Sequence, residues 1–309
     1  MAKTLIVIAG PTAIGKTTLA IKLAQKYHTE IISADSRQFY REMEIGTAKP
    51  SLEELKVAKH HFINSLSVND HYTVGDYEKE ALLLIDELFK KHDVIILVGG
   101  SGLFIKAIID GFDDLPASSE EIRKGLNDLF KIQGITSLQK KLKEVDPVFY
   151  NEVDLNNPQR LIRALEVYET TGKPFSDFRN DTKKKRPFDI IQIGLNIERE
   201  KLYENINLRV DLMVDNGLVQ EVLALRQFRH LNPLNTVGYS ELFDYFDEKL
   251  TLKEAIGQIK QNTRRFAKRQ LTWFRKAKDF KWFEPQEDEM LFSYLESVLE
   301  DPAHVVRKS

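Results

Sequence analysis

The residues best suited to chemistry lie near the start of the chain, in a stretch that reads GPTAIGKT. The pattern G-x-x-x-x-G-K-[ST] is typical of a phosphate-binding loop, whose backbone N–H groups surround phosphate oxygens. Lys16 would add a positive charge, and the hydroxyl of Thr17 would bind Mg²⁺. The residues expected to bind a diphosphate or nucleotide are Gly10, Pro11, Thr12, Ala13, Ile14, Gly15, Lys16 and Thr17. The loop predicts a di- or triphosphate, which is transferred, hydrolysed or only a leaving group.

A carboxylate follows the second predicted strand, where residues 30–35 read EIISAD. In doubly wound sheets, ligands lie beyond the carboxyl ends of the strands. Asp35 is therefore expected beside the phosphate loop if its strand runs parallel to the first. A carboxylate near a cation and a phosphate can take a proton from a nucleophile. A magnesium ligand or a helix N-cap are the alternatives that this position leaves open.

Arg209 lies in a predicted helix over residues 197–213, at the border of its apolar face. That face is formed by Leu202, Ile206, Val210 and Met213. An arginine here could hold a phosphate with two hydrogen bonds. The spacing alone favours an arginine on the protein surface.

The most basic stretch lies near the C-terminus, where residues 260–281 hold nine Lys or Arg and one acid. A helix over 252–278 would place Arg264 one turn from Lys268, and Arg265 one turn from Arg269. Cations with interleaved aromatic residues suit the backbone and bases of a nucleic acid. The alternative is an amphipathic helix with solvated charges, but the overall acidity of the chain makes RNA the favoured interpretation.

A second basic helix is predicted over residues 158–171, with a proline at its start. Arg160 and Arg163 lie on neighbouring turns, within reach of phosphates. An ion pair of Arg163 with Glu166 or Glu169 explains the pattern equally well.

The elements that must position these residues are those of an α/β protein. Apolar strands are predicted over 5–9, 30–35, 93–98 and 189–195, with helices over 51–61, 77–91, 218–228 and 238–246 between or after them. Residues 113–187 read as an all-helical insertion, with helices over 119–132 and 137–145 before that over 158–171. The predicted fold is thus a P-loop NTPase-like parallel sheet flanked by helices, formed by 1–112 and 188–309 and interrupted by the insertion.

The third strand ends unusually for such a protein. A typical phosphate-loop ATPase places there an Asp that helps to hold Mg²⁺. This chain instead has Gly99, Gly100, Ser101 and Gly102. Simple ATP hydrolysis is disfavoured for that reason.

The composition narrows the setting in which the protein works. The chain has 309 residues, a formal net charge of −2 and no cysteine. Disulfides, cysteine zinc sites and thiol nucleophiles are therefore excluded, and a cytoplasmic location is expected. No stretch approaches the roughly 20 apolar residues of a membrane span. His60 and His61 are expected on the helix over 51–61, without partners for a metal site.

Taken together, the motifs resemble those of the bacterial tRNA dimethylallyltransferases (tRNA isopentenyltransferases). The blocks that carry the resemblance occur in order along most of the chain: GPTAIGKT, DSRQFY from Asp35, IGTAKP from Ile45, GGSGLF from Gly99, NPQRLIRALE from Asn157, VGYSE from Val237 and AKRQLTWFR from Ala267. One such block would be weak, but seven in order are highly specific. The family block GGTGLY is altered here, since Ser101 keeps a hydroxyl and Phe104 lacks one.

The resemblance implies a transfer of the dimethylallyl group from dimethylallyl diphosphate to N6 of adenine 37, in the anticodon stem-loop of tRNA. It implies that Lys16, Thr17 and Mg²⁺ hold the diphosphate, that Asp35 is the base and that Arg209 binds the diphosphate. It also implies that the insertion is a mobile tRNA-binding domain. The family positions that contact tRNA correspond to Asp35, Ser36, Arg37, Gln38, Ser101, Arg123, Gln159, Arg160, Leu161, Ile162 and Arg163. We add the basic-helix residues Arg264, Arg265, Lys268 and Arg269, and expect a monomer.

Three other functions share some of these features. A small-molecule or nucleotide kinase and a non-catalytic GTPase-like RNA-binding module would also have a phosphate loop, but the missing strand-end Asp argues against both. An isopentenyltransferase acting on free adenine nucleotides would need neither the basic helix nor the insertion.

Overall fold

The computed structural model describes residues 2–112, 115–116, 119–179 and 183–300. The chain divides into two compact units, one formed by residues 1–109 and 185–309, the other by residues 110–184. Each unit has a hydrophobic core of its own.

In the described residues, the first unit is built on a six-stranded parallel sheet with the order β3-β2-β4-β1-β5-β6. All four predicted strands are present, and the fold class predicted from the sequence is confirmed. The strands are β1 (Thr4–Ala9), β2 (Ile31–Ser33), β3 (His60–His61), β4 (Val94–Gly99), β5 (Asp189–Leu195) and β6 (Lys281–Phe283).

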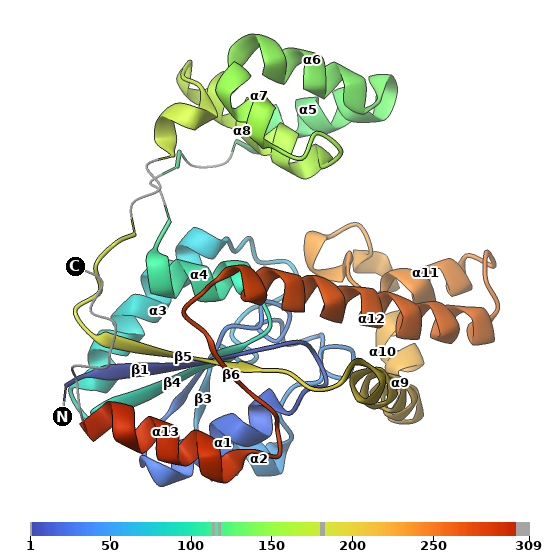
Figure 1. Cartoon of the computed structure of the whole chain (residues 1–309). Coiled ribbons are helices and arrows are strands. Elements are labelled where there is room, and N and C mark those ends of the chain that lie inside the picture. Colours follow the sequence, from blue (N-terminus) through green and yellow to red (C-terminus); the bar gives the residue numbers. More distant parts are fainter. Residues whose placement is uncertain (1, 113–114, 117–118, 180–182, 301–309) are drawn as a thin grey trace. The chain divides into compact units, whose positions relative to one another are not determined.

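Helices cover both faces of this sheet (Figure 1). Successive residues of β1 point to opposite faces, so Ile6 and Ile8 join the core beneath α1 and α13, whereas Leu5 and Val7 join the core beneath α3 and α4. Buried on both faces, the central strands are nearly all apolar, as parallel strands usually are. The helices named here are α1 (Lys16–Lys26), α3 (Val74–Phe89), α4 (Gly102–Asp110) and α13 (Asp288–Glu300).

A third core is formed by the later helices of the first unit, which lie beyond the carboxyl end of β5 (Figure 1). It joins residues of α9, α10, α11 and α12 to Tyr40 and Met43, which follow β2. These helices are α9 (Arg199–Asp215), α10 (Leu218–Ala224), α11 (Ser240–Phe246) and α12 (Leu252–Lys276), with 3₁₀ turns η2 (Arg226–Phe228) and η3 (Asn232–Leu234).

The second unit is helical throughout its regular structure. Its elements are α5 (Glu120–Gln133), α6 (Ile135–Val145), α7 (Pro147–Glu152), α8 (Pro158–Thr171) and η1 (Phe175–Phe178). Where the unit begins and ends, the N–H of Lys184 donates to the carbonyl of Asp110 at 2.8 Å. The two ends of the insertion therefore lie side by side.

Some expectations about local structure were wrong. The helix expected over 51–61 is the short α2 (Leu52–Val57), and His60 and His61 instead form the edge strand β3 beside Ile31 and Ile32. Pairing with β2 overrides the helical pattern there. The helix expected over 218–228 ends at Ala224, and α4, α7, α13 and β6 were not predicted.

None of the helices in the described part of the chain combines the length and apolar character needed to cross a membrane.

Candidate active site

The phosphate-loop motif joins β1 to α1, as the pattern predicts. Helix α1 begins at Lys16, and no side chain caps its first N–H groups. Such unpaired amides and the positive end of the helix dipole form an anion site. The Lys16 ammonium donates to the carbonyl of Pro11 at 2.7 Å. Burial of this ammonium lowers the pKa of Lys16 to about 8, with Asp35 opposing the shift and Arg209 adding to it.

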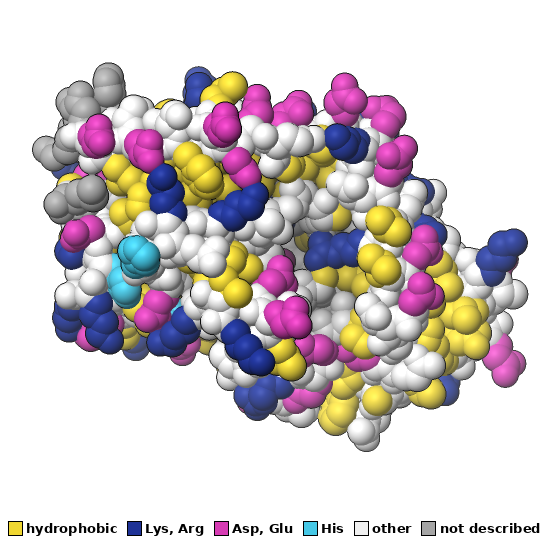
Figure 2. All heavy atoms as spheres, turned by 90° about the horizontal axis from the view of Figure 1, so that it is seen from below, with side chains coloured by type: hydrophobic (Ala, Val, Ile, Leu, Met, Phe, Trp, Pro, Cys, Tyr) yellow, Lys and Arg dark blue, Asp and Glu magenta, His cyan; other side chains and the backbone are white. Residues whose placement is uncertain are grey.

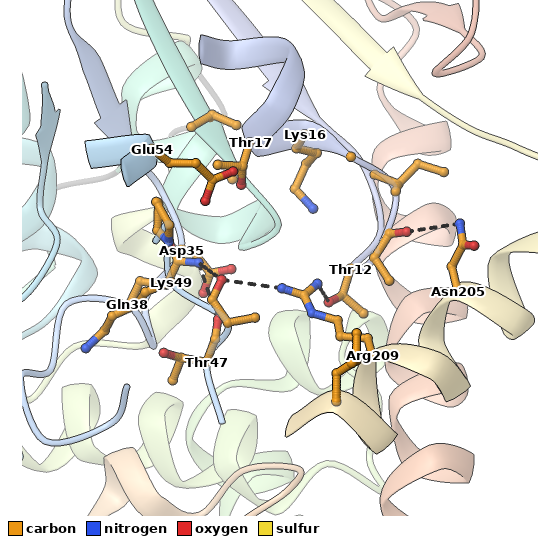
Figure 3. Close-up of a pocket in the computed structure, with 18 of the residues that line it drawn as sticks. Thr12, Lys16, Thr17, Asp35, Gln38, Thr47, Lys49, Glu54, Asn205 and Arg209 are labelled. Carbon is orange, nitrogen blue, oxygen red and sulfur yellow. Dashed lines mark hydrogen bonds between the residues drawn. The ribbon is translucent and has the colours of Figure 1, made fainter. Parts of the chain in front are cut away.

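The loop forms one wall of a cavity of about 440 Å³ (Figure 3). Asp35 reaches the same cavity because β2 and β1 both run parallel to β4, so their carboxyl ends share one edge of the sheet. Residues 36–39 form turns, and the N–H of Arg37 donates to Asp35 Oδ1 at 3.3 Å. No helix begins at Asp35 in this described segment, so the N-cap interpretation was wrong.

Arg209 points into this cavity from α9 (Figure 3). Its Nη1 donates to Thr12 Oγ1 at 3.0 Å and its Nη2 to the carbonyl of Ala48 at 3.4 Å. Burial lowers the pKa of Arg209, with Asp35 opposing the shift, yet a guanidinium stays charged in proteins. The surface position that the spacing favoured was therefore wrong, since the side chain is held against the phosphate loop.

A second cavity, of about 450 Å³, adjoins the first. It is lined by Ser36, Arg37, Ser101 and Phe104, and by residues of α12 that include Phe266, Arg269 and Trp273. The residues that line both cavities are Thr12, Asp35, Thr47, Ala48 and Arg209. Asp35 and Arg209 are thus placed to act on ligands in either cavity.

Helix α12 explains why glycines follow β4. A Cβ on Gly100 would lie 2.4 Å from Gln270 Nε2, and one on Gly102 would lie 2.2 Å from atoms of the Trp273 ring. The buried Gln270 side chain donates to the Gly100 carbonyl at 2.9 Å and accepts from the N–H of Thr12 at 2.9 Å. Gln270 therefore ties α12 both to the end of β4 and to the phosphate loop.

Sequence reasoning overlooked Gln270, although it lies inside a quoted motif. Its two partners are 170 and 258 residues away in the chain. Only the fold brings them together, and a glutamine in a basic helix carries no local signal of such a role.

Five of the residues predicted to contact tRNA line the second cavity: Asp35, Ser36, Arg37, Ser101 and Arg269. The Oγ of Ser101 accepts from the N–H of Ser36 at 3.2 Å. Gln38 lines the first cavity instead, and its amide donates to the carbonyl of Ala48 at 3.2 Å. Phe104 packs in an aromatic cluster with Phe39 and Tyr77.

On α12, the basic residues differ in their surroundings. Arg264 donates to Asn207 Oδ1 at 2.6 Å and lies over the Tyr203 ring, so it is part of the contact with α9. Arg265 and Lys268 are exposed. These two side chains remain the clearest candidates for contact with the phosphate backbone of a nucleic acid.

In the second unit, Gln159 and Arg160 are exposed at the start of α8, whereas Leu161 and Ile162 are fully buried in its core. Arg163 pairs with the buried carboxylate of Glu166 at 3.0 Å, and Arg123 lies 3.8 Å from it. The ion pair that the sequence allowed for Arg163 is therefore present.

The residues around the phosphate loop suit a magnesium ion only if a bound phosphate ligand also coordinates that ion. Among the described residues, no group of three His, Cys, Asp or Glu is placed to hold a metal ion. The hydroxyl of Thr17 and the carboxylates of Asp35 and Glu54 line the first cavity (Figure 3). Mg²⁺ usually keeps several waters and takes substrate phosphates as ligands, so this donor set fits the ion together with a diphosphate.

Charge is mixed on the face seen in Figure 2. Hydrophobic, basic and acidic side chains are interspersed there around a hollow, in keeping with the net charge of −2. Attraction of a polyanion to this molecule must therefore come from local groups.

Comparison with known proteins gives a consistent result. A family model described as IPP transferase matches residues 38–277. The tRNA dimethylallyltransferase of Christiangramia forsetii is 57% identical over 298 residues, which covers 96% of this chain and 99% of the relative. That of Flavobacterium johnsoniae is 52% identical, covering 93% and 94%.

The similar solved structures are also of transferases that act on tRNA. The tRNA isopentenylpyrophosphate transferase of Bacillus halodurans superposes with a TM-score of 0.72 at 36% identity, covering 97% of this chain and 98% of its own. A eukaryotic dimethylallyltransferase acting on tRNA gives a TM-score of 0.82 at 25% identity, covering 99% and 82%. The family match spans most of the chain, and the relatives match it nearly end to end. This chain belongs to the IPP transferase family.

Proposed function

We propose that this protein is a tRNA dimethylallyltransferase, which moves the dimethylallyl group of dimethylallyl diphosphate to N6 of adenine 37 in tRNA. The observation that carries the proposal is the wall shared by the two cavities. A phosphate loop lines one cavity, exposed aromatic and basic residues of α12 line the other, and Asp35 and Arg209 line both. The names of the relatives supply the two substrates.

The diphosphate would occupy the first cavity. The α1 amides, Lys16 and Arg209 would stabilise the negative charge that develops on it as the allylic C–O bond breaks. Bound Mg²⁺, held by Thr17 and the diphosphate, would neutralise part of that charge. An enzyme that releases diphosphate and never hydrolyses a nucleotide need not keep the strand-end Asp of the phosphate-loop ATPases.

The adenine would enter the second cavity, from which its exocyclic amine faces Asp35. As the new bond forms between N6 and the allylic carbon, the amine proton would pass to the Asp35 carboxylate. An adenine within a stem-loop must leave its stack to reach an enclosed site. Phe266 and Trp273, which are 40% and 39% exposed at the cavity edge, supply flat surfaces for that base or its neighbours.

The proposal extends to the setting of the enzyme. We propose a monomer as the active form. The absence of cysteine supports the cytoplasm as its location.

The test is incubation of the protein with Mg²⁺, dimethylallyl diphosphate and a tRNA that has adenines at positions 36–38. Mass spectrometry of the digested tRNA should show one added dimethylallyl group on adenine 37, and AMP should remain unmodified. Modified AMP would support an enzyme that acts on free nucleotides. Phosphate transfer from ATP without any gain of mass on tRNA would support a kinase and refute the proposal.

A further inference from the structure

Glu221 on α10 lines neither cavity, yet it is tied to a segment that lines both. Among the described residues, its carboxylate accepts four hydrogen bonds. Three come from consecutive backbone N–H groups, of Glu44 at 3.0 Å, Ile45 at 2.7 Å and Gly46 at 3.0 Å. The fourth comes from the hydroxyl of Tyr239 at 2.6 Å. Hydrogen bonds to an ionised acceptor are roughly twice as strong as neutral ones, so this carboxylate is a firm anchor.

The anchored segment leads directly to the shared wall of the site. Thr47 and Ala48 line both cavities. Ala48 has a φ of +46°, which a residue with a side chain adopts only when its surroundings hold it there. Its carbonyl accepts from Arg209 Nη2 at 3.4 Å and from Gln38 Nε2 at 3.2 Å. The position of this carbonyl therefore helps to fix the direction of the Arg209 guanidinium.

Tyr239 holds the same segment by contact as well as by its hydroxyl. The buried ring leaves no room beside Gly46, where a Cβ would lie 2.6 Å from ring atoms. Burial and the nearby Glu221 carboxylate raise the pKa of the Tyr239 hydroxyl, which keeps it protonated as a donor. Residues from α10 and from the turn before α11 thus converge on one short loop.

We propose that Glu221, together with Tyr239, is a positioning residue for the diphosphate site. It acts through residues 44–48, which aim Arg209 at the phosphate groups. The inference rests on the proposed function only in taking the first cavity as the diphosphate site.

The test compares Glu221→Gln with a matched control, Glu42→Gln. Glutamine at 221 keeps the size of the side chain but loses the charge, and its NH₂ group must oppose at least one of the four donors. Glu42 also accepts hydrogen bonds from a hydroxyl and a backbone N–H, those of Ser67 at 2.7 Å and Val68 at 3.0 Å. Neither Ser67 nor Val68 lines either cavity. Both variants remove the charge of a carboxylate that accepts from backbone N–H and hydroxyl groups, with four such hydrogen bonds at Glu221 and two at Glu42.

The probe is inorganic diphosphate with Mg²⁺, measured by calorimetry, beside hydrogen exchange of the backbone amides and thermal unfolding. We expect Glu221→Gln to weaken diphosphate binding about tenfold, to raise KM for the allylic donor more than it lowers kcat, and to speed exchange at residues 44–46. Glu42→Gln should leave binding unchanged at a similar loss of stability. Tyr239→Phe, which keeps the ring, should weaken binding about threefold and serves if Glu221→Gln does not fold.

Equal loss of diphosphate affinity in the Glu221 and Glu42 variants would overturn the inference, as would unchanged affinity in both Glu221→Gln and Tyr239→Phe. Diphosphate binding and amide exchange do not depend on prenyl transfer. A failure of the proposed function would therefore appear separately, as absence of tRNA modification by the unaltered protein.

Discussion

At the scale of single residues, burial decides how the charges of the site behave. Lys16 and Arg209 are both desolvated, and the carboxylate of Asp35 is the group that opposes the lowering of their pKa values. The first cavity is lined by three cations, Lys16, Lys49 and Arg209, and by the two carboxylates of Asp35 and Glu54, which leaves a positive balance. A doubly or triply charged anion is the natural ligand of such an arrangement.

Lys16 gives this balance a dependence on pH. Because its pKa in the ligand-free protein is about 8, the ammonium loses its proton as the pH rises through that value. A bound diphosphate favours the charged form. Affinity for inorganic diphosphate with Mg²⁺, measured by calorimetry, should therefore decline from about pH 8 upward.

Lys16→Ala should bind the diphosphate about 10- to 100-fold more weakly at pH 7, the loss expected for a charged hydrogen bond. Its affinity should lack the additional decline around pH 8. Identical pH profiles for the variant and the unaltered protein would exclude Lys16 as the titrating group.

The residues that the sequence could predict are those whose role is encoded locally. Lys16 and Thr17 belong to a motif that fixes its own backbone geometry. Arg209 could be assigned only by resemblance, because its contact with Thr12 joins residues 197 apart in the chain. Gln270 and Glu221 were missed for the same reason, since each meets its partners only after the chain has folded.

At the scale of elements, the two sides of α12 have different roles. One side packs against the sheet and the phosphate loop through Gln270 and Phe274, and the other presents exposed cations. Its basic character was evident in the sequence, but only the structure separates Arg264, which contacts α9, from the exposed Arg265 and Lys268.

This separation predicts how tRNA binding depends on salt. Each contact between a cation and a phosphate releases counterions, so removing one lowers the slope of log K against log salt by about one. The double variant Arg265→Ala, Lys268→Ala should bind tRNA more weakly, with a slope reduced by about two. Filter binding or fluorescence anisotropy across a salt series measures it.

The control for that experiment is Lys253→Ala, which removes an exposed cation from the first turn of the same helix. Its salt slope should match that of the unaltered protein. An unchanged slope in the double variant would mean that this side of α12 does not meet the nucleic acid.

Sequence patterns located long elements better than short ones. Helix α12 was expected over 252–278 and spans Leu252–Lys276, because its apolar period is sustained over many turns. β3 has two residues and was taken for the end of a helix, since its conformation depends on pairing with β2. Helix α7 was overlooked, although Asp146 caps it and Pro147 begins it.

At the scale of the whole molecule, the proposed catalytic groups and the insertion belong to separate compact units. All the described residues that line the two cavities belong to the first unit. The second unit begins and ends at neighbouring points, where Lys184 N–H meets the Asp110 carbonyl at 2.8 Å. The insertion can therefore be removed without stretching the chain that remains.

A variant in which a short glycine linker replaces residues 111–183 should fold, because the first unit has its own cores on both faces of the sheet. It should keep its affinity for inorganic diphosphate, measured by calorimetry, and lose most of its affinity for tRNA. A folded variant that binds tRNA as tightly as the full chain would show that the insertion does not take part in tRNA binding.

The central claim is that Asp35 acts on the acceptor amine while other groups hold the diphosphate, and Asp35→Asn tests it most directly. A general base contributes about 10²- to 10⁴-fold, so the single-turnover rate of tRNA prenylation should fall by that factor while affinity for tRNA and for diphosphate changes little. Loss of tRNA affinity as large as the loss of rate, or a rate within a fewfold of the unaltered enzyme, would contradict the account.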